Sequence, residues 1–130
     1  MKETGLTLTL LPDELTVCQV RDLDRISLPA GLFFLARTDE EVSLVCRTAD
    51  APRETLRRRD GWRGFRVSGT LDFSLVGILS RLSGILAAEG ISIFAVSTYN
   101  TDYILVKEND LDRALDMLAA AGYEIDRGKA

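Results

Sequence analysis

Residues 71–106 constrain the fold of this 130-residue chain more than any other segment. The leucines of residues 75–89 recur at helical spacing on one face, which predicts an amphipathic helix. Gly90 is a candidate for the residue that ends it. The apolar runs 91–98 and 103–107 then predict two strands joined by a short polar turn. The segment therefore predicts a turn, a helix and a strand pair in succession.

The segments on either side extend this order. Residues 62–68 predict a strand whose side chains alternate between two faces, Phe65 and Val67 opposite Arg66 and Ser68. A second helix is predicted after Asn109 or Asp110, ending at Gly122, and residues 123–126 predict a last strand. The inward face of this second helix would carry Leu111, Ala114, Leu115 and Leu118.

The predicted order is strand, helix, strand, strand, helix, strand, which is the ferredoxin-like βαββαβ arrangement of an α+β protein. Right-handed crossovers would place both helices on one face of a four-stranded antiparallel sheet. The strand at 91–98 is apolar on both sides, so the opposite face also needs a cover. We expect the first half of the chain or a second chain to provide it.

The first sixty residues predict a weaker copy of this order. The expected elements are strands at 6–11 and 15–20 around the turn 12–14, a helical turn within 21–27, strands at 32–37 and 42–47, and a short helix at 52–59. No segment matches the long helix at 75–89. The two halves are expected to share one sheet or to pack side by side.

Composition places the chain among soluble globular proteins, with 46% hydrophobic and 28% charged residues. Its apolar runs are shorter than a membrane span and its start does not resemble a signal peptide, so we expect a cytoplasmic protein without a membrane partner. The net charge of −4 argues against a nucleic-acid partner. Six arginines within residues 53–66 leave two interpretations, a phosphate or nucleic-acid patch and a solvated helix end before an edge strand.

Several kinds of catalytic chemistry are excluded because the chain contains no histidine. Ser–His–Asp, Cys–His and histidine-based zinc sites all require one. Cys18 and Cys46 lie in apolar runs without CxxC spacing, which predicts buried reduced thiols. No pair of carboxylates is marked out by spacing. We therefore predict no catalytic residue, no metal, no cofactor and no enzymatic activity.

The start of the helix at 75–89 is a candidate anion site, because free amides and the helix dipole attract a carboxylate there. Ser74 is a plausible N-cap, and Asp72 could instead occupy the site as an internal cap. Gly77, Ser80, Gly84 and Ala88 form a stripe of small residues. Close approach of a ligand near Gly77 and packing against a helix or partner subunit both remain open.

Two sequence matches point to a family. The segment SLVGILSRLSGILAAEGISIFAVST, with Gly77 and the Gly90–Ile93 entry to the next strand, resembles the ACT domain of amino-acid-regulated enzymes, aspartokinases above all. LDFSLVGIL together with STYNTDYILV resembles the aspartokinase-type paired ACT proteins related to the CASTOR arginine sensors. The resemblance covers residues 62–127. It implies an ACT domain at 62–130 and a degenerate ACT-like half at 1–61.

The resemblance also implies a ligand site at two turns. Asp72, Phe73, Val76 and Gly77 would form the carboxylate end. In the turn at 98–102, Thr98 and Tyr99 would supply backbone groups and a ring wall beside Asn100. Asp102 would recognise cationic charge on the ligand, although it could also simply cap the turn.

The function expected from this resemblance is that of a non-catalytic regulatory sensor. Its partner would be a small ligand such as an amino acid, and the chain would form a homodimer. The alternative is a protein–protein interaction module without a small-molecule ligand.

Overall fold

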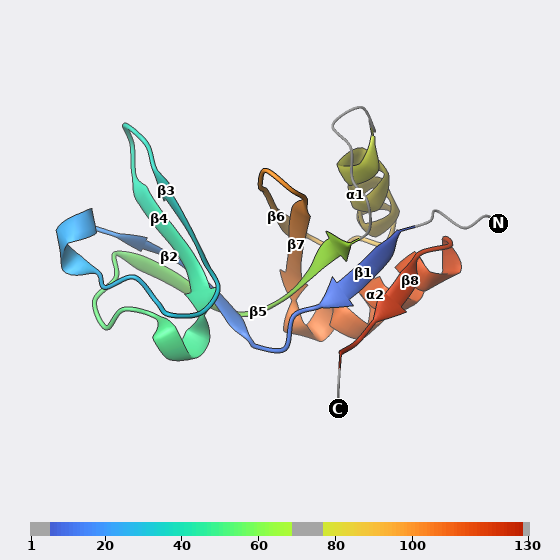
Figure 1. Ribbon diagram of the computed structural model, residues 1–130, viewed down its shortest axis with the longest axis horizontal. Helices are drawn as coiled ribbons and strands as arrows, with labels where there is room; N and C mark the ends of the chain where they lie inside the picture. Colours follow the sequence, from blue (N-terminus) through green and yellow to red (C-terminus); the bar gives the residue numbers. More distant parts are fainter. Residues whose placement is uncertain (1–5, 69–76, 129–130) are drawn as a thin grey trace. The chain divides into compact units, whose positions relative to one another are not determined.

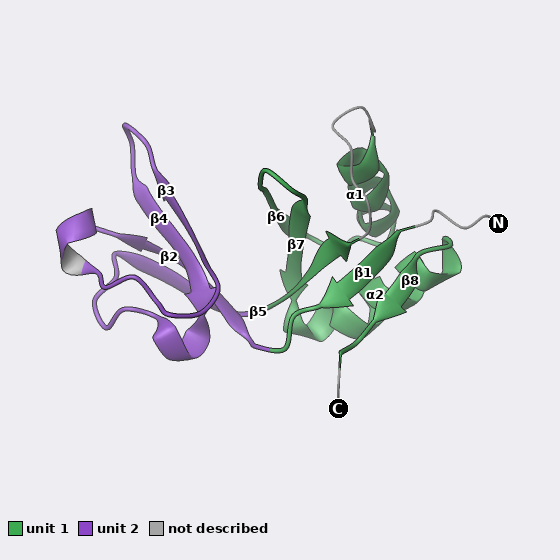
Figure 2. Cartoon of the chain, in the orientation of Figure 1, with its two compact units in different colours: residues 1–12, 63–130 green, residues 13–62 purple. Residues whose placement is uncertain are grey.

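The computed structural model describes residues 6–68 and 77–128 (Figure 1). The elements in chain order are β1 Thr7–Leu10, β2 Leu15–Val20, η1 Leu23–Arg25, β3 Phe33–Arg37, β4 Val42–Arg47, η2 Thr48–Asp50, β5 Arg57–Ser68, α1 Ile78–Ala88, β6 Ile93–Ser97, β7 Asp102–Lys107, η3 Glu108–Asp110, α2 Leu111–Ala120 and β8 Glu124–Asp126. They fall into two compact units, a large unit of residues 1–12 and 63–130 and a small unit of residues 13–62 (Figure 2). None of the described helices is long and apolar enough to span a bilayer.

The large unit contains the predicted βαββαβ order, as β5, α1, β6, β7, α2 and β8. The ferredoxin-like α+β fold is thus confirmed. Its sheet, in the order β6-β7-β5-β1-β8, has one strand more than predicted. β1 lies between β5 and β8, with Leu8 opposite Val67 in an antiparallel pair and opposite Ile125 in a parallel pair. The prediction of four strands was wrong because β1 pairs with segments far along the chain, which no local pattern reveals.

Both helices of the large unit pack on the same face of its sheet. Leu82 and Leu86 of α1 and Leu115 and Leu118 of α2 are fully buried together with Phe65, Val67, Ile104 and Val106 of the strands. Each such side chain stabilises the fold by about 1.5–3 kcal/mol relative to exposure. Because side chains alternate along a strand, Arg66, Tyr103 and Leu105 point to the opposite face. Leu105 is also fully buried, so both faces of β7 are covered at that point.

The small unit has a sheet in the order β3-β4-β2-β5 and no α-helix among its described residues. The 3₁₀ turns η1 and η2 stand where the two crossover helices of a ferredoxin-like fold would be. A small core of Cys18, Val20, Leu44 and Cys46 packs against Ile26, Phe33, Val42 and Ala51. The strand order 2-3-1-4 within the unit is that of the ferredoxin-like sheet.

Three elements of the small unit recur in the large unit sixty residues later. β3 at 33–37 matches β6 at 93–97, β4 matches β7, and η2 at 48–50 matches η3 at 108–110. The turns between the strands also match. The Thr38 amide donates to the Glu41 carbonyl at 2.9 Å, and the Thr98 amide donates to the Thr101 carbonyl at 2.8 Å.

Two further expectations for the first half were wrong. The short helix predicted at 52–59 does not form, because β5 begins at Arg57 and pairs with β2. β1 and β2 do not make a hairpin around residues 12–14, since they pair in different units. Through the pairing of β1 with β5 and β8, residues 1–12 lie in the same compact unit as residues 63–130.

Candidate functional site

The turn between β6 and β7 is hydrogen-bonded to the end of β5. Within the turn, the Thr98 hydroxyl donates to the Thr101 carbonyl at 3.0 Å and accepts the Thr101 amide at 3.3 Å. The Thr101 hydroxyl in turn donates to the backbone carbonyl of Val67. Three elements of one unit, β5, β6 and β7, therefore meet at one corner.

A surface pocket of about 310 Å³ lies at this corner. Its lining comes from the end of β5 (Arg66, Val67 and Ser68), from the turn (Thr98, Asn100 and Thr101) and from Tyr103 of β7. This volume is at the lower end of the range typical of small-molecule sites, which suits a ligand of metabolite size. Thr98 and Asn100 are two of the predicted site residues, and the structure brings them together here.

Arg66 supplies the positive charge of the pocket. It is half-buried on the face of β5 that points away from the helices, opposite Thr9 of β1. Within the described residues its guanidinium has no hydrogen bond or ion pair. Its neighbour Ser68 shares a 2.9 Å hydrogen bond with Thr9 through the two hydroxyls. An unpaired guanidinium beside neutral hydroxyls can receive a carboxylate.

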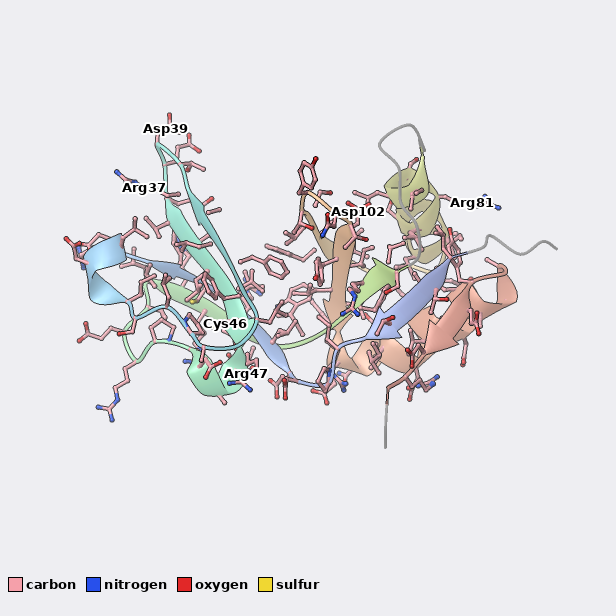
Figure 3. The ribbon with its side chains drawn as sticks, viewed as in Figure 1. Arg37, Asp39, Cys46, Arg47, Arg81 and Asp102 are labelled. Atoms are coloured by element: carbon pink, nitrogen blue, oxygen red, sulfur yellow. The ribbon has the colours of Figure 1, made fainter. Side chains whose placement is uncertain are left out.

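Asp102 and Tyr99, also predicted for the site, do not line this pocket. Asp102 begins β7 (Figure 3) and shares the helix-facing side of the strand with Ile104 and Val106. One of its carboxylate oxygens accepts the Ser97 hydroxyl at 2.6 Å. Tyr99 is at the tip of the turn with 83% of its surface exposed. The predicted turn residues are thus divided between two faces of the sheet.

Gly77 immediately precedes α1 and has a φ of +82°, a backbone conformation that favours glycine. It was predicted inside a longer helix, which is wrong, because α1 begins at Ile78. A Cβ atom at Gly77 or at Gly84 would meet no described atom within 4 Å, so neither glycine is required by packing within the described chain. Ser74 and the predicted ligand residues Asp72, Phe73 and Val76 lie outside the described residues. Whether their turn adjoins the corner stays a prediction.

The two cysteines are buried free thiols on β2 and β4, as predicted. Burial raises the pKa of Cys46 to about 11, helped by the neighbouring Cys18, and burial also raises the pKa of Cys18. Both side chains are therefore protonated and unreactive near neutral pH. Among the residues that the structure describes, no group of three or more potential metal ligands is found.

The arginine-rich segment forms part of a strand and not the end of a helix. Arg57, Arg58 and Arg59 are exposed on β5. The Arg58 guanidinium donates to the Asp60 carboxylate at 2.8 Å, which lowers the pKa of Asp60. The first four arginines belong to the small unit, whereas Arg63 and Arg66 belong to the large unit, and Arg66 alone of the six lines the corner pocket.

Comparison with known proteins identifies related sequences. The family model described as ACT domain matches residues 57–120. The cytosolic arginine sensor for mTORC1 subunit 1 of Mus musculus is 40% identical over 58 residues, which is 44% of this chain. That match spans only 18% of the length of the sensor.

Solved structures extend the likeness to nearly the whole chain. Protein Atu0741 from Agobacterium tumefaciens is 31% identical with a TM-score of 0.83, covering 96% of this chain and 95% of that one. The regulatory subunit of aspartate kinase from Thermus thermophilus has a TM-score of 0.60 at 11% identity, covering 92% of this chain and 97% of that one. At that identity the second likeness concerns the fold alone.

Proposed function

We propose that this chain, which belongs to the ACT-domain family, is a non-catalytic regulatory protein that binds an amino acid. The observation that carries the proposal is the pocket where β5 meets the β6–β7 turn. Arg66 lies in its wall, and the Arg66 guanidinium has no hydrogen bond or ion pair among residues 6–68 and 77–128. The similarity to an arginine sensor and the shared fold with a regulatory kinase subunit support a sensing role. The identity of the amino acid is a separate question.

The chemistry of the pocket suits the groups that all amino acids share. Arg66 can hold the α-carboxylate through paired N–H donors. The hydroxyl groups of Ser68 and Thr98 and the side-chain amide of Asn100 can accept the α-ammonium or bind a polar side chain. These partners come from a strand end and a turn, so a bound ligand would link the two.

Regulation would follow from this link. A ligand that binds one arrangement of the turn better than another shifts the equilibrium by the difference in its binding free energies. The turn is joined directly to β6 and β7, and β6 is the outermost strand at that end of the sheet. We propose that the response passes through this edge to a partner copy of the chain in a cytoplasmic homodimer.

The repeated elements support an ACT-like origin for the small unit. Its strand order is ferredoxin-like, and β3, β4 and η2 recur sixty residues later as β6, β7 and η3. We propose that it is a degenerate ACT-like half that has lost both crossover helices.

Thermal denaturation in the presence of each of the twenty amino acids tests the proposal. At least one is expected to raise the melting temperature in a concentration-dependent way, because it binds the folded state. Arg66→Gln should abolish that shift. Arg127→Gln is the matched control, since Arg127 is an exposed arginine of the same unit outside the pocket. No shift with any amino acid at millimolar concentration would refute the sensing role.

An interaction module without a small ligand is the second candidate. Leu28 and Leu56 of the small unit are 61% and 53% exposed, which is unusual for leucine. Leu28→Ser with Leu56→Ser would then weaken self-association in sedimentation experiments. Unchanged association together with an amino-acid-dependent thermal shift would exclude this alternative.

A further inference from the structure

The corner pocket has a one-sided charge. Among the described residues of its lining, Arg66 is the charged one, and the side chains of Val67, Ser68, Thr98, Asn100, Thr101 and Tyr103 are neutral. No Asp or Glu is found among the described residues that line the pocket. The described part of the wall therefore carries a positive charge, which comes from Arg66.

The carboxylates that the structure describes in the large unit lie outside the lining of this pocket. Asp102 is on the helix-facing side of β7 and accepts the Ser97 hydroxyl. Glu124 and Asp126 share the face of Arg66 but sit on β8, beyond the intervening strand β1. Two strand spacings put them about 10 Å from the β5 backbone. Arg66 lines the pocket, whereas Asp102, Glu124 and Asp126 do not.

We propose that this pocket accepts amino acids with a neutral or anionic side chain and discriminates against cationic ones such as arginine and lysine. The inference rests on the proposed amino-acid-binding function and specifies the ligand class. Arg66 holds the α-carboxylate, and a second positive charge nearby is repelled. The described wall offers no carboxylate to pair with a cationic side chain, so such a ligand binds with lower affinity.

Arginine and citrulline provide a matched pair of probes. They have nearly the same size and hydrogen-bonding shape, but citrulline carries a neutral ureido group in place of the guanidinium. Isothermal titration at low salt is expected to show binding of citrulline at least about tenfold tighter than that of arginine. Glutamine should likewise bind more tightly than lysine. The difference should shrink at high salt, because screening weakens the repulsion.

The variant Arg66→Gln separates the possible causes. It should weaken citrulline binding and reduce the preference over arginine, whereas Arg127→Gln should change neither. Circular dichroism of both variants serves as the check that they fold. Arginine or lysine binding as tightly as the neutral probes would overturn the inference while leaving the sensing role intact. If none of the probes and none of the twenty amino acids binds, both the inference and the sensing role fail.

Discussion

The hydroxyl of Thr101 donates a hydrogen bond to the backbone carbonyl of Val67. This contact joins the β6–β7 turn to the end of β5, and the pocket lies beside it. A side chain in a turn thus fixes the distance between two walls of the site. Pre-organisation of this kind raises affinity because less conformational freedom is lost on binding.

Replacing Thr101 by valine tests this role, since valine keeps the shape and removes the hydroxyl. We expect the free energy of unfolding to fall by about 1 kcal/mol, because the Val67 carbonyl loses its partner. Amino-acid affinity should fall as well. Urea denaturation and titration calorimetry measure the two effects. Thr101→Ser keeps the hydroxyl donor and should retain most of the stability and most of the amino-acid affinity. Equal losses of stability and affinity in the valine and serine variants would argue against a role for the hydrogen bond.

The glycines around α1 should respond in opposite directions to alanine. Gly77 has φ +82°, where an L-residue is strained, so Gly77→Ala should destabilise the fold by about 1–2 kcal/mol. Gly84 lies inside α1 with free space around it, so Gly84→Ala should stabilise by about 0.5–1 kcal/mol through helix propensity. Chemical denaturation of both variants measures this. A destabilised Gly84→Ala protein with a smaller sedimentation coefficient would reveal a partner helix packed against that position.

Local sequence patterns predicted the large unit well because its elements are encoded by nearby residues. The leucine spacing of α1 and the positive-φ glycines Gly90 and Gly122 after the two helices all lie within a few residues of the element they define. The insertion of β1 between β5 and β8 could not be predicted in this way. It depends on pairs such as Leu8 with Val67, which are distant along the chain.

The small unit depends on a buried polar network that is also open to a test. Thr16 has no exposed surface, and its hydroxyl donates to Asp60 at 2.7 Å while sharing a 2.8 Å hydrogen bond with Thr48. Thr16→Val should lower the free energy of unfolding by about 1–3 kcal/mol, because both partners lose a hydrogen bond. Thr16→Ser keeps the hydroxyl and is the control, so it should lower the free energy of unfolding less than Thr16→Val does. Equal stability of the valine variant would show that the network is dispensable.

Burial of Cys46 predicts a loss of stability at alkaline pH. The unfolded thiol ionises near pH 8.5, whereas the folded thiol has a pKa of about 11. Between these values the unfolded state binds fewer protons, so stability falls as pH rises. The loss reaches roughly 3 kcal/mol at the upper end. Urea denaturation from pH 7 to pH 10.5 should show a shallower decline for Cys46→Ala, and parallel curves would contradict the assigned pKa.

The site was only partly accessible to sequence reasoning. The turn residues Thr98 and Asn100 were predicted, and the alternation of the strand at 62–68 already placed Arg66 and Ser68 on one face. What could not be seen was which face meets the turn, since that depends on the pairing of β7 with β5. For this reason Arg66 was grouped with the other arginines and not with the ligand residues.

The most direct test of amino-acid binding at the corner is an NMR titration of the ¹⁵N-labelled protein. The probe is the amino acid that raises the melting temperature most. The account predicts that the largest amide shifts occur at Arg66, Ser68, Asn100 and Thr101, with small changes in residues 13–62. Saturable shifts confined to another part of the chain, or no shifts at all, would contradict it.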